Sequence, residues 1–191
     1  MWQQLDTKAI TALEKAKAEG KQIVMLSQTL ASPSSYALIE QLKEKNCEDI
    51  FVYCNSLSSV VDFDRLAIEH NIKIVTPMQM YRNLGLEYKY LAVMAANSHG
   101  LTGVENNLYV SNPRLRVLGL SMLELVKAIE EGNKPEQIVE DFNFKTLFNY
   151  FELTNVEAVV LGCTHFPYIK KELEKIIQKN KKTKNTKDTK K

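Results

Sequence analysis

The stretch VVLGCTHFP, residues 159–167, places a thiol, a hydroxyl and an imidazole side by side at the end of an apolar run. Gly162 permits close approach of a backbone or a ligand, and Thr164 offers a hydroxyl. His165 can polarise the Cys163 thiol or hold a carboxylate, although a histidine at a strand end is more often structural. Because no paired-cysteine spacing completes a ligand set, the stretch predicts a thiol site and no metal site.

A second stretch, YCNSLSS at residues 53–59, follows the apolar run DIFV in the same way. Cys54 is followed by Asn55 and Ser56 where a strand gives way to a helix, so a thiol, an amide, a hydroxyl and the N–H groups of a helix start come together. These groups suit a carboxylate and favour a thiolate. The alternative is a buried cysteine at a strand end, with Asn55 and Ser56 only capping the helix.

Apolar periodicity predicts strands that alternate with helices along the chain. Strands are predicted at residues 22–26, 49–54, 72–77, 90–96, 115–120 and 156–163. Helices are predicted at 7–19, 32–46, 58–71, 79–84, 122–132 and 143–155, with Ser121 as the N-cap of the fifth. This alternation is typical of an α/β fold with parallel sheets and crossover connections. Since ligands gather at the carboxyl ends of such strands, Cys54 and Cys163 are predicted to face one crevice.

The composition, with 45% hydrophobic and 25% charged residues, is that of a soluble globular protein. No stretch has the roughly 18 apolar residues that a membrane helix needs, and the first residues lack the order of a signal peptide. A cytoplasmic location without membrane association is therefore expected. The three cysteines, Cys47, Cys54 and Cys163, are then expected to be reduced thiols.

Residues 178–191 hold seven lysines, one aspartate and no apolar residue. The formal net charge of +2 thus combines +6 in this segment with −4 in the rest of the chain. A lysine-rich end of this kind predicts a disordered, solubilising tail, and it does not favour nucleic-acid binding as the function of the chain.

Both cysteine stretches resemble the active-site motifs of the cofactor-independent aspartate/glutamate racemases, and of glutamate racemase in particular. VVLGCTHFP is similar to the second cysteine motif of that family and YCNSLSS to the first. Between them, LAIEHNIKIVTPMQMYRNL, YLAVMAANSHGLTGVENNLY and LRVLGLSMLELVKAIEEG resemble the family's intervening segments. The resemblance extends over residues 8–177.

The resemblance implies two Rossmann-like α/β domains related by pseudo-symmetry. Residues 1–78 would form the first, with Cys54, and residues 79–177 the second, with Cys163. It also implies an isomerase that needs no cofactor, in which one thiolate removes the α-proton of glutamate or aspartate while the opposing thiol delivers another. In this family the product is D-glutamate for cell-wall peptidoglycan.

The family's substrate-binding neighbours of the two cysteines match Asn55, Ser56, Thr164 and His165, with Ser56 in place of the usual threonine. A further recognition loop corresponds to QTLASPSS, in which Ser34 and Ser35 replace a tyrosine and a glycine. These two serines are assigned to substrate binding on that correspondence. In the second domain, AANSHG corresponds to a polar loop whose threonines are absent.

The resemblance further implies a chain shortened at both ends, with an incomplete first domain, because the family's opening strand and its aspartate have no clear counterpart. Asp6 is the one candidate remnant. An uncovered sheet edge favours pairing with another chain, so a homodimer is one expectation. Two alternatives to a racemase stay open: a truncated pseudoenzyme that binds a small carboxylate or a protein partner without efficient turnover, and another thiol-dependent lyase or hydrolase of small acids.

Overall fold

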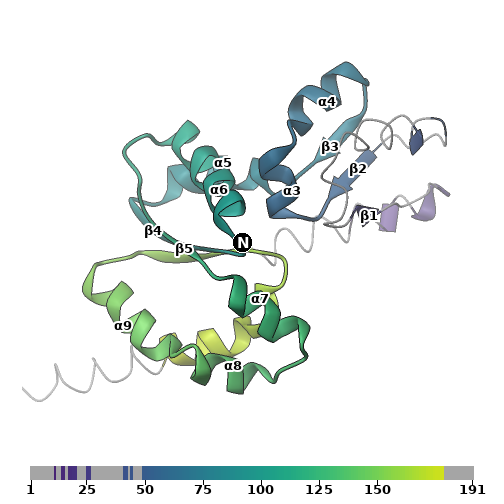
Figure 1. Cartoon of the computed structure of the whole chain (residues 1–191). Coiled ribbons are helices and arrows are strands. Elements are labelled where there is room, and N and C mark those ends of the chain that lie inside the picture. The colour runs from purple at the N-terminus through teal and green to yellow at the C-terminus, as the bar shows by residue number, and fades with distance from the viewer. Residues whose placement is uncertain are drawn as a thin grey trace, which may run out of the picture.

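The computed structural model describes residues 11, 14–15, 17–20, 25–26, 41–42, 44 and 49–178 of the chain. These residues form two parallel sheets, each of three strands, with helices packed against them (Figure 1). The predicted α/β class with parallel sheets is confirmed. The predicted domain boundary at residue 78 is not tested by this arrangement and stays a prediction.

The first sheet has the order β1-β2-β3, from β1 (Met25–Leu26), β2 (Asp49–Val52) and β3 (Lys73–Val75). Ile50 pairs with Ile74 in register, and both side chains are buried. The helices α3 (Asn55–Val60) and α4 (Phe63–Glu69) follow β2 and turn Leu57 and Leu66 into the same core. Cys54 belongs to this core.

The second sheet has the order β5-β4-β6, with β4 (Tyr90–Ala95) between β5 (Arg116–Ser121) and β6 (Ala158–Gly162). The central strand is buried on both faces, so Leu91 and Val93 point into one core while Ala92 and Met94 point into another. This double burial explains why YLAVMA is a continuous apolar run.

Helices cover both faces of the second sheet (Figure 1). α5 (Met78–Glu87) and α6 (Ser98–Ser111) lie on one face. The other face is covered by α7 (Leu123–Glu130), α8 (Pro135–Asp141) and α9 (Phe144–Leu153), together with the short 3-10 helix η2 (Phe166–Ile169) and a helix over residues 170–178. Cys163 belongs to this second core.

Four details differ from the sequence-based expectations. The helix predicted over 58–71 is two helices, because Val61 is extended and the Asp62 side chain accepts a hydrogen bond from Arg65 N–H, which starts α4 anew. Ser121 ends β5 and does not cap α7, whose N-cap is Met122 without a side-chain hydrogen bond. α8, which begins at Pro135, was not predicted.

The fourth difference concerns AANSHG, which was expected to be a polar loop. Asn97 is the N-cap of α6, its side chain accepts a hydrogen bond from Gly100 N–H, and the helix begins at Ser98. The segment therefore ends a strand and starts a helix. Most of the helices predicted over 7–19 and 32–46 lies outside the described residues. None of the described helices is long and apolar enough to cross a membrane.

The packing of α4 predicts that two substitutions on this helix will change the free energy of unfolding by different amounts. Leu66 is fully buried in α4, while Ile68 on the same helix is 81% exposed. Leu66→Ala should lower the free energy of unfolding by about 2 to 5 kcal/mol, because it leaves a cavity. Ile68→Ala should change it by less than about 0.5 kcal/mol. Urea unfolding followed by circular dichroism measures both, and equal losses would contradict the packing of α4.

Candidate functional site

Cys54 follows β2 after one intervening residue, Tyr53, and occupies the N-cap position of α3. Its backbone is extended, its side chain is buried, and its Sγ accepts a hydrogen bond from Leu57 N–H at 3.4 Å. Asn55 and Ser56 therefore do not cap α3, since the thiol itself is the cap, whereas the other part of that alternative, a buried cysteine after a strand, agrees with the structure. A backbone N–H directed at sulfur stabilises negative charge there.

Asn55 is the first residue of α3 and is buried, although its side chain is polar. Its Oδ1 accepts a hydrogen bond from the hydroxyl of Tyr81 on α5, at 2.7 Å. Its Nδ2 is buried and has no hydrogen-bond partner among the residues that the structure describes. A buried donor without a partner costs about 1 to 3 kcal/mol, so this amide N–H₂ is a group that a bound acceptor would satisfy.

Cys163 lies at the carboxyl end of β6 and begins a chain of polar contacts. Its Sγ is 3.5 Å from His165 Nδ1, and His165 Nε2 is 3.1 Å from an oxygen of Glu130 on α7. A carboxylate only accepts hydrogen bonds, so Nε2 carries the proton in the neutral imidazole. His165 Nδ1 is then left as an acceptor for the Cys163 S–H.

Glu130 was not found from the sequence. It is the last residue of α7, separated from His165 by 35 positions, and it looks like any charged residue of an amphipathic helix. The one signal that could have identified Glu130 is topological. It lies on α7, the helix that follows β5, and β5 belongs to the same sheet as the strand before Cys163. Tyr81 was missed for a similar reason, since it looks like an ordinary core aromatic of α5.

The electrostatics of Cys163 favour the neutral thiol. Burial raises the pKa of Cys163, and the charges of Cys54 and Glu130 raise it further. Hydrogen bonds from the backbone of His165 and Phe166 lower that pKa in part. Ionisation of Cys54 therefore influences Cys163, which means that charge on one sulfur is felt at the other.

Tyr81 lies within reach of the same charges. Burial raises the pKa of the Tyr81 phenol far above its ordinary value, and the charge of Cys163 raises it further. Tyr81 is thus hydrogen bonded to the residue after one cysteine and electrostatically coupled to the other. The neutral phenol donates a hydrogen bond to Asn55 Oδ1, so the amide N–H₂ of Asn55 remains available to another acceptor.

The remaining predicted site residues have different outcomes. Ser56 is half-buried and faces Gly100 at the start of α6. Thr164 is half-buried beside Cys163. Ser34, Ser35, Asp6 and Cys47 lie outside the described residues. Both described cysteines are free thiols, and no group of three metal-binding side chains occurs in the part of the chain that the structure describes.

A cavity of about 190 Å³ lies at the other end of β6. It is lined by Phe148, Phe151, Glu152, Val156, Glu157, Ala158, Val159 and Ile177. None of the predicted site residues that the structure describes lines this cavity. A single pocket with the two thiols on opposite walls therefore stays a prediction.

The raised pKa of Cys163 predicts its reactivity. Because the thiolate is the nucleophile, iodoacetamide should alkylate Cys163 more slowly than free cysteine at neutral pH. The rate should rise about tenfold per pH unit until the pH reaches the raised pKa, beyond that of an ordinary cysteine. Mass spectrometry of the Cys163 peptide measures the alkylation rate in a Cys47→Ser, Cys54→Ser background. This background removes the charge of Cys54 but leaves burial, the largest cause of the raised pKa of Cys163. Rapid alkylation that levels off below pH 8 would contradict the assignment.

Comparison with known proteins places these contacts in context. No family model matches the chain. The chain is 27% identical to a curated glutamate racemase of Clostridium botulinum over 155 residues, and 28% identical to one of Clostridium kluyveri over 158 residues. Each alignment covers 76% of this chain, and they cover 57% and 58% of the two relatives. The chain thus spans little more than half the length of these relatives.

Solved structures agree with the sequence comparison. A glutamate racemase of Francisella tularensis, in complex with D-glutamate, superposes with a TM-score of 0.62 at 22% identity, over 78% of this chain and 57% of that one. The glutamate racemase of Campylobacter jejuni superposes with a TM-score of 0.57 at 19% identity, over 78% and 60%. The resemblance to glutamate racemases is therefore confirmed in sequence, and the fold of this chain is the α/β fold of those enzymes.

Proposed function

We propose that the chain is a glutamate racemase that uses Cys54 and Cys163 as its acid and base. The observation that carries this proposal is the hydrogen-bonded series from Glu130 through His165 to Cys163, together with the electrostatic coupling of Cys163 to Cys54. The similarity to curated glutamate racemases supports the choice of substrate. The product would be D-glutamate for peptidoglycan synthesis in the cytoplasm.

In the proposed reaction, the thiolate of Cys54 removes the α-proton of one enantiomer, so the C–H bond breaks and an S–H bond forms. The Cys163 thiol gives its proton to the opposite face, which leaves a thiolate at Cys163. The reverse direction uses the same two groups with their roles exchanged. Inversion of the centre therefore needs both thiols.

The surrounding groups serve these steps. The free Nδ2 of Asn55 would donate to the substrate carboxylate, where negative charge grows as the proton leaves. His165 Nδ1 would accept the S–H of Cys163 and carry a proton to or from it between turnovers. Glu130 would hold the imidazole in the tautomer that makes this possible.

The proposal predicts that Cys54→Ser and Cys163→Ser each abolish racemisation, because a serine hydroxyl is far too weak an acid to exchange this proton at neutral pH. Incubation of L- and D-glutamate in heavy water, followed by NMR and chiral chromatography, separates α-proton exchange from net inversion. Cys47→Ser is the matched control and should keep wild-type activity. Racemisation by either mutant at wild-type rate would defeat the mechanism, and aspartate in parallel reactions tests the substrate.

Glu130→Gln gives a second prediction in which two observables move in opposite directions. Racemisation should fall by about 10- to 100-fold, because the amide holds the imidazole less firmly in the required tautomer. Since the charge of Glu130 raises the pKa of Cys163, its removal should lower that pKa and speed alkylation of Cys163. Parallel kinetics of racemisation and iodoacetamide labelling measure the two effects. A joint fall of both rates would indicate a purely structural role.

A further inference from the structure

The two thiols lie in separate cores, yet one helix contacts both the helix that Cys54 begins and the strand that Cys163 follows. We infer that α6 is a rigid spacer that sets the separation of Cys54 and Cys163, with Gly103 as its positioning residue. This inference rests on the proposed function for its catalytic consequence, but its geometry can be tested without activity. It follows from three sets of contacts, to α3, to β6 and, through Arg82 of α5, to α4.

The first contact joins α6 to the helix that Cys54 begins. A Cβ added at Gly103 would lie 2.1 Å from the Cβ of Ser59 and 3.0 Å from its Cα. One turn earlier, a Cβ at Gly100 would lie 3.1 Å from the hydroxyl oxygen of Ser56. The two glycines and the two serines are each three residues apart, so small residues on both helices let the backbones approach closely. Any displacement of α3 here also displaces Cys54.

The second contact joins α6 to the strand that carries Cys163. Val104, the residue after Gly103, is fully buried on the sheet. A Cβ added at Gly162 would lie 3.6 Å from a methyl group of Val104 and 3.0 Å from the backbone oxygen of Met94. Since Gly162 is followed by Cys163, consecutive residues of α6 reach towards the two cysteine-bearing segments.

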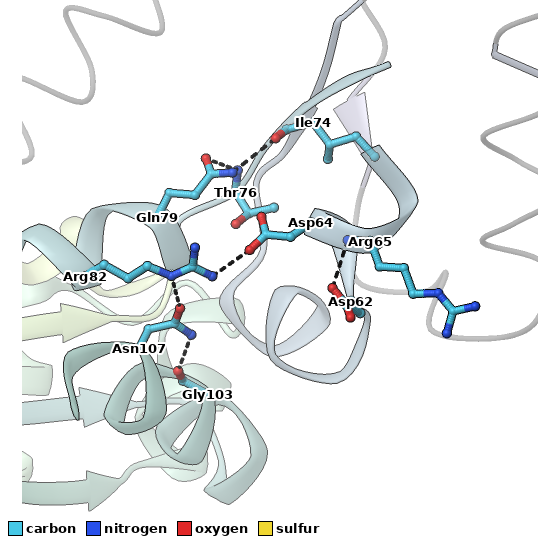
Figure 2. A network of polar contacts seen from close by, with 9 residues as sticks. All are labelled: Asp62, Asp64, Arg65, Ile74, Thr76, Gln79, Arg82, Gly103 and Asn107. Carbon is cyan, nitrogen blue, oxygen red and sulfur yellow. Dashed lines mark hydrogen bonds and ion pairs between the residues drawn. The ribbon is translucent and has the colours of Figure 1, made fainter. Parts of the chain in front are cut away.

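The third contact is a polar network that links the same turn of α6, through Arg82 on α5, to α4 beside the first sheet (Figure 2). Asn107 Nδ2 donates to the backbone oxygen of Gly103 at 2.9 Å, and Asn107 Oδ1 accepts from Arg82 Nε at 2.8 Å. Arg82 also donates to Asp64 on α4 at 2.6 Å. The ion pair is half-exposed and so contributes little free energy, but it shows that α4 and α6 both lie within reach of the Arg82 side chain.

A methyl group at Gly103 therefore cannot be accommodated unless α3 moves away from α6. The obstacle is Ser59 Cβ and backbone rather than the end of a flexible side chain. Because a misplacement of about 1 Å can cost about 100-fold in rate, such a movement should separate the two half-reactions. Removal of a proton on one face would continue, while delivery from the opposite face would fail.

The test uses Gly103→Ala in a Cys47→Ser background, where Cys54 and Cys163 are the only thiols. A series of bifunctional thiol reagents of increasing length measures the separation of the two sulfurs by the yield of intramolecular cross-link, identified by mass spectrometry. The reagent length that gives the highest yield of cross-link should be longer in Gly103→Ala than in the protein with Gly103. Gly100→Ala, where the obstacle is a hydroxyl, should shift it in the same direction by less.

Two further variants distinguish a change in the separation of the two sulfurs from a general loss of stability. Ser59→Gly combined with Gly103→Ala removes the obstructing Cβ and should restore the original optimal reagent length. If Gly103→Ala alone does not fold, this double variant shows whether relief of the contact with Ser59 restores folding. Gly85→Ala is the matched control, because its Cβ would lie 2.6 Å from the backbone oxygen of Leu108 in the contact of α5 with α6, away from α3. It should lower stability without changing the optimum.

Activity measurements distinguish failure of this inference from failure of the proposed function. In heavy water, Gly103→Ala should lose net inversion at least about 10-fold more than α-proton exchange, and the Ser59→Gly double variant should recover it. An unchanged cross-linking optimum in folded Gly103→Ala overturns the inference whatever the activity. A shifted optimum in a chain that racemises nothing would uphold the spacer and overturn the racemase.

Discussion

Two thiols that end strands of different sheets can act on one carbon atom only if the sheets are held at a fixed separation. In this chain the contact between α3 and α6 imposes that constraint, because Gly103 and Ser59 leave no room between the helix backbones. Most contacts inside each core would survive if the sheets moved apart as rigid bodies. The acid–base geometry would not, so the glycine contact is the part of the structure on which a two-thiol site depends.

The candidate site contains buried polar side chains whose presence packing alone does not explain. Asn55 is buried with an amide donor that no described residue satisfies, and Tyr81 beside it is buried with its phenol neutral. An apolar pair of similar shape would cost less free energy at these positions. A buried network that leaves one donor free is typical of a site that binds an acceptor, and the carboxylate of an amino acid is an acceptor of this kind.

The sequence predicted the strands well because each is a short apolar run between turn residues, and it placed both cysteines correctly at strand ends. It failed where local signals compete. Val61 and Asp62 break a helix that periodicity alone would continue, and Ser121 looks like a cap but completes a strand. Glu130 and Tyr81 could not be found, since their roles depend on contacts across 35 and 26 residues that no local pattern records.

The two halves of the site are supported by different physical means. The Cys163 sulfur lies beside the imidazole of His165, which in turn contacts the carboxylate of Glu130, so it has ionisable neighbours that can pass a proton onward. Within the described residues, the hydrogen bond received by the Cys54 sulfur comes from a backbone N–H, which stabilises charge but exchanges no proton with the sulfur. A thiolate at Cys54 also raises the pKa of Cys163 and so favours the protonated state of Cys163. One charge shared between two thiols is the resting state that a two-base inversion needs, because one group must accept a proton while its counterpart has one to give.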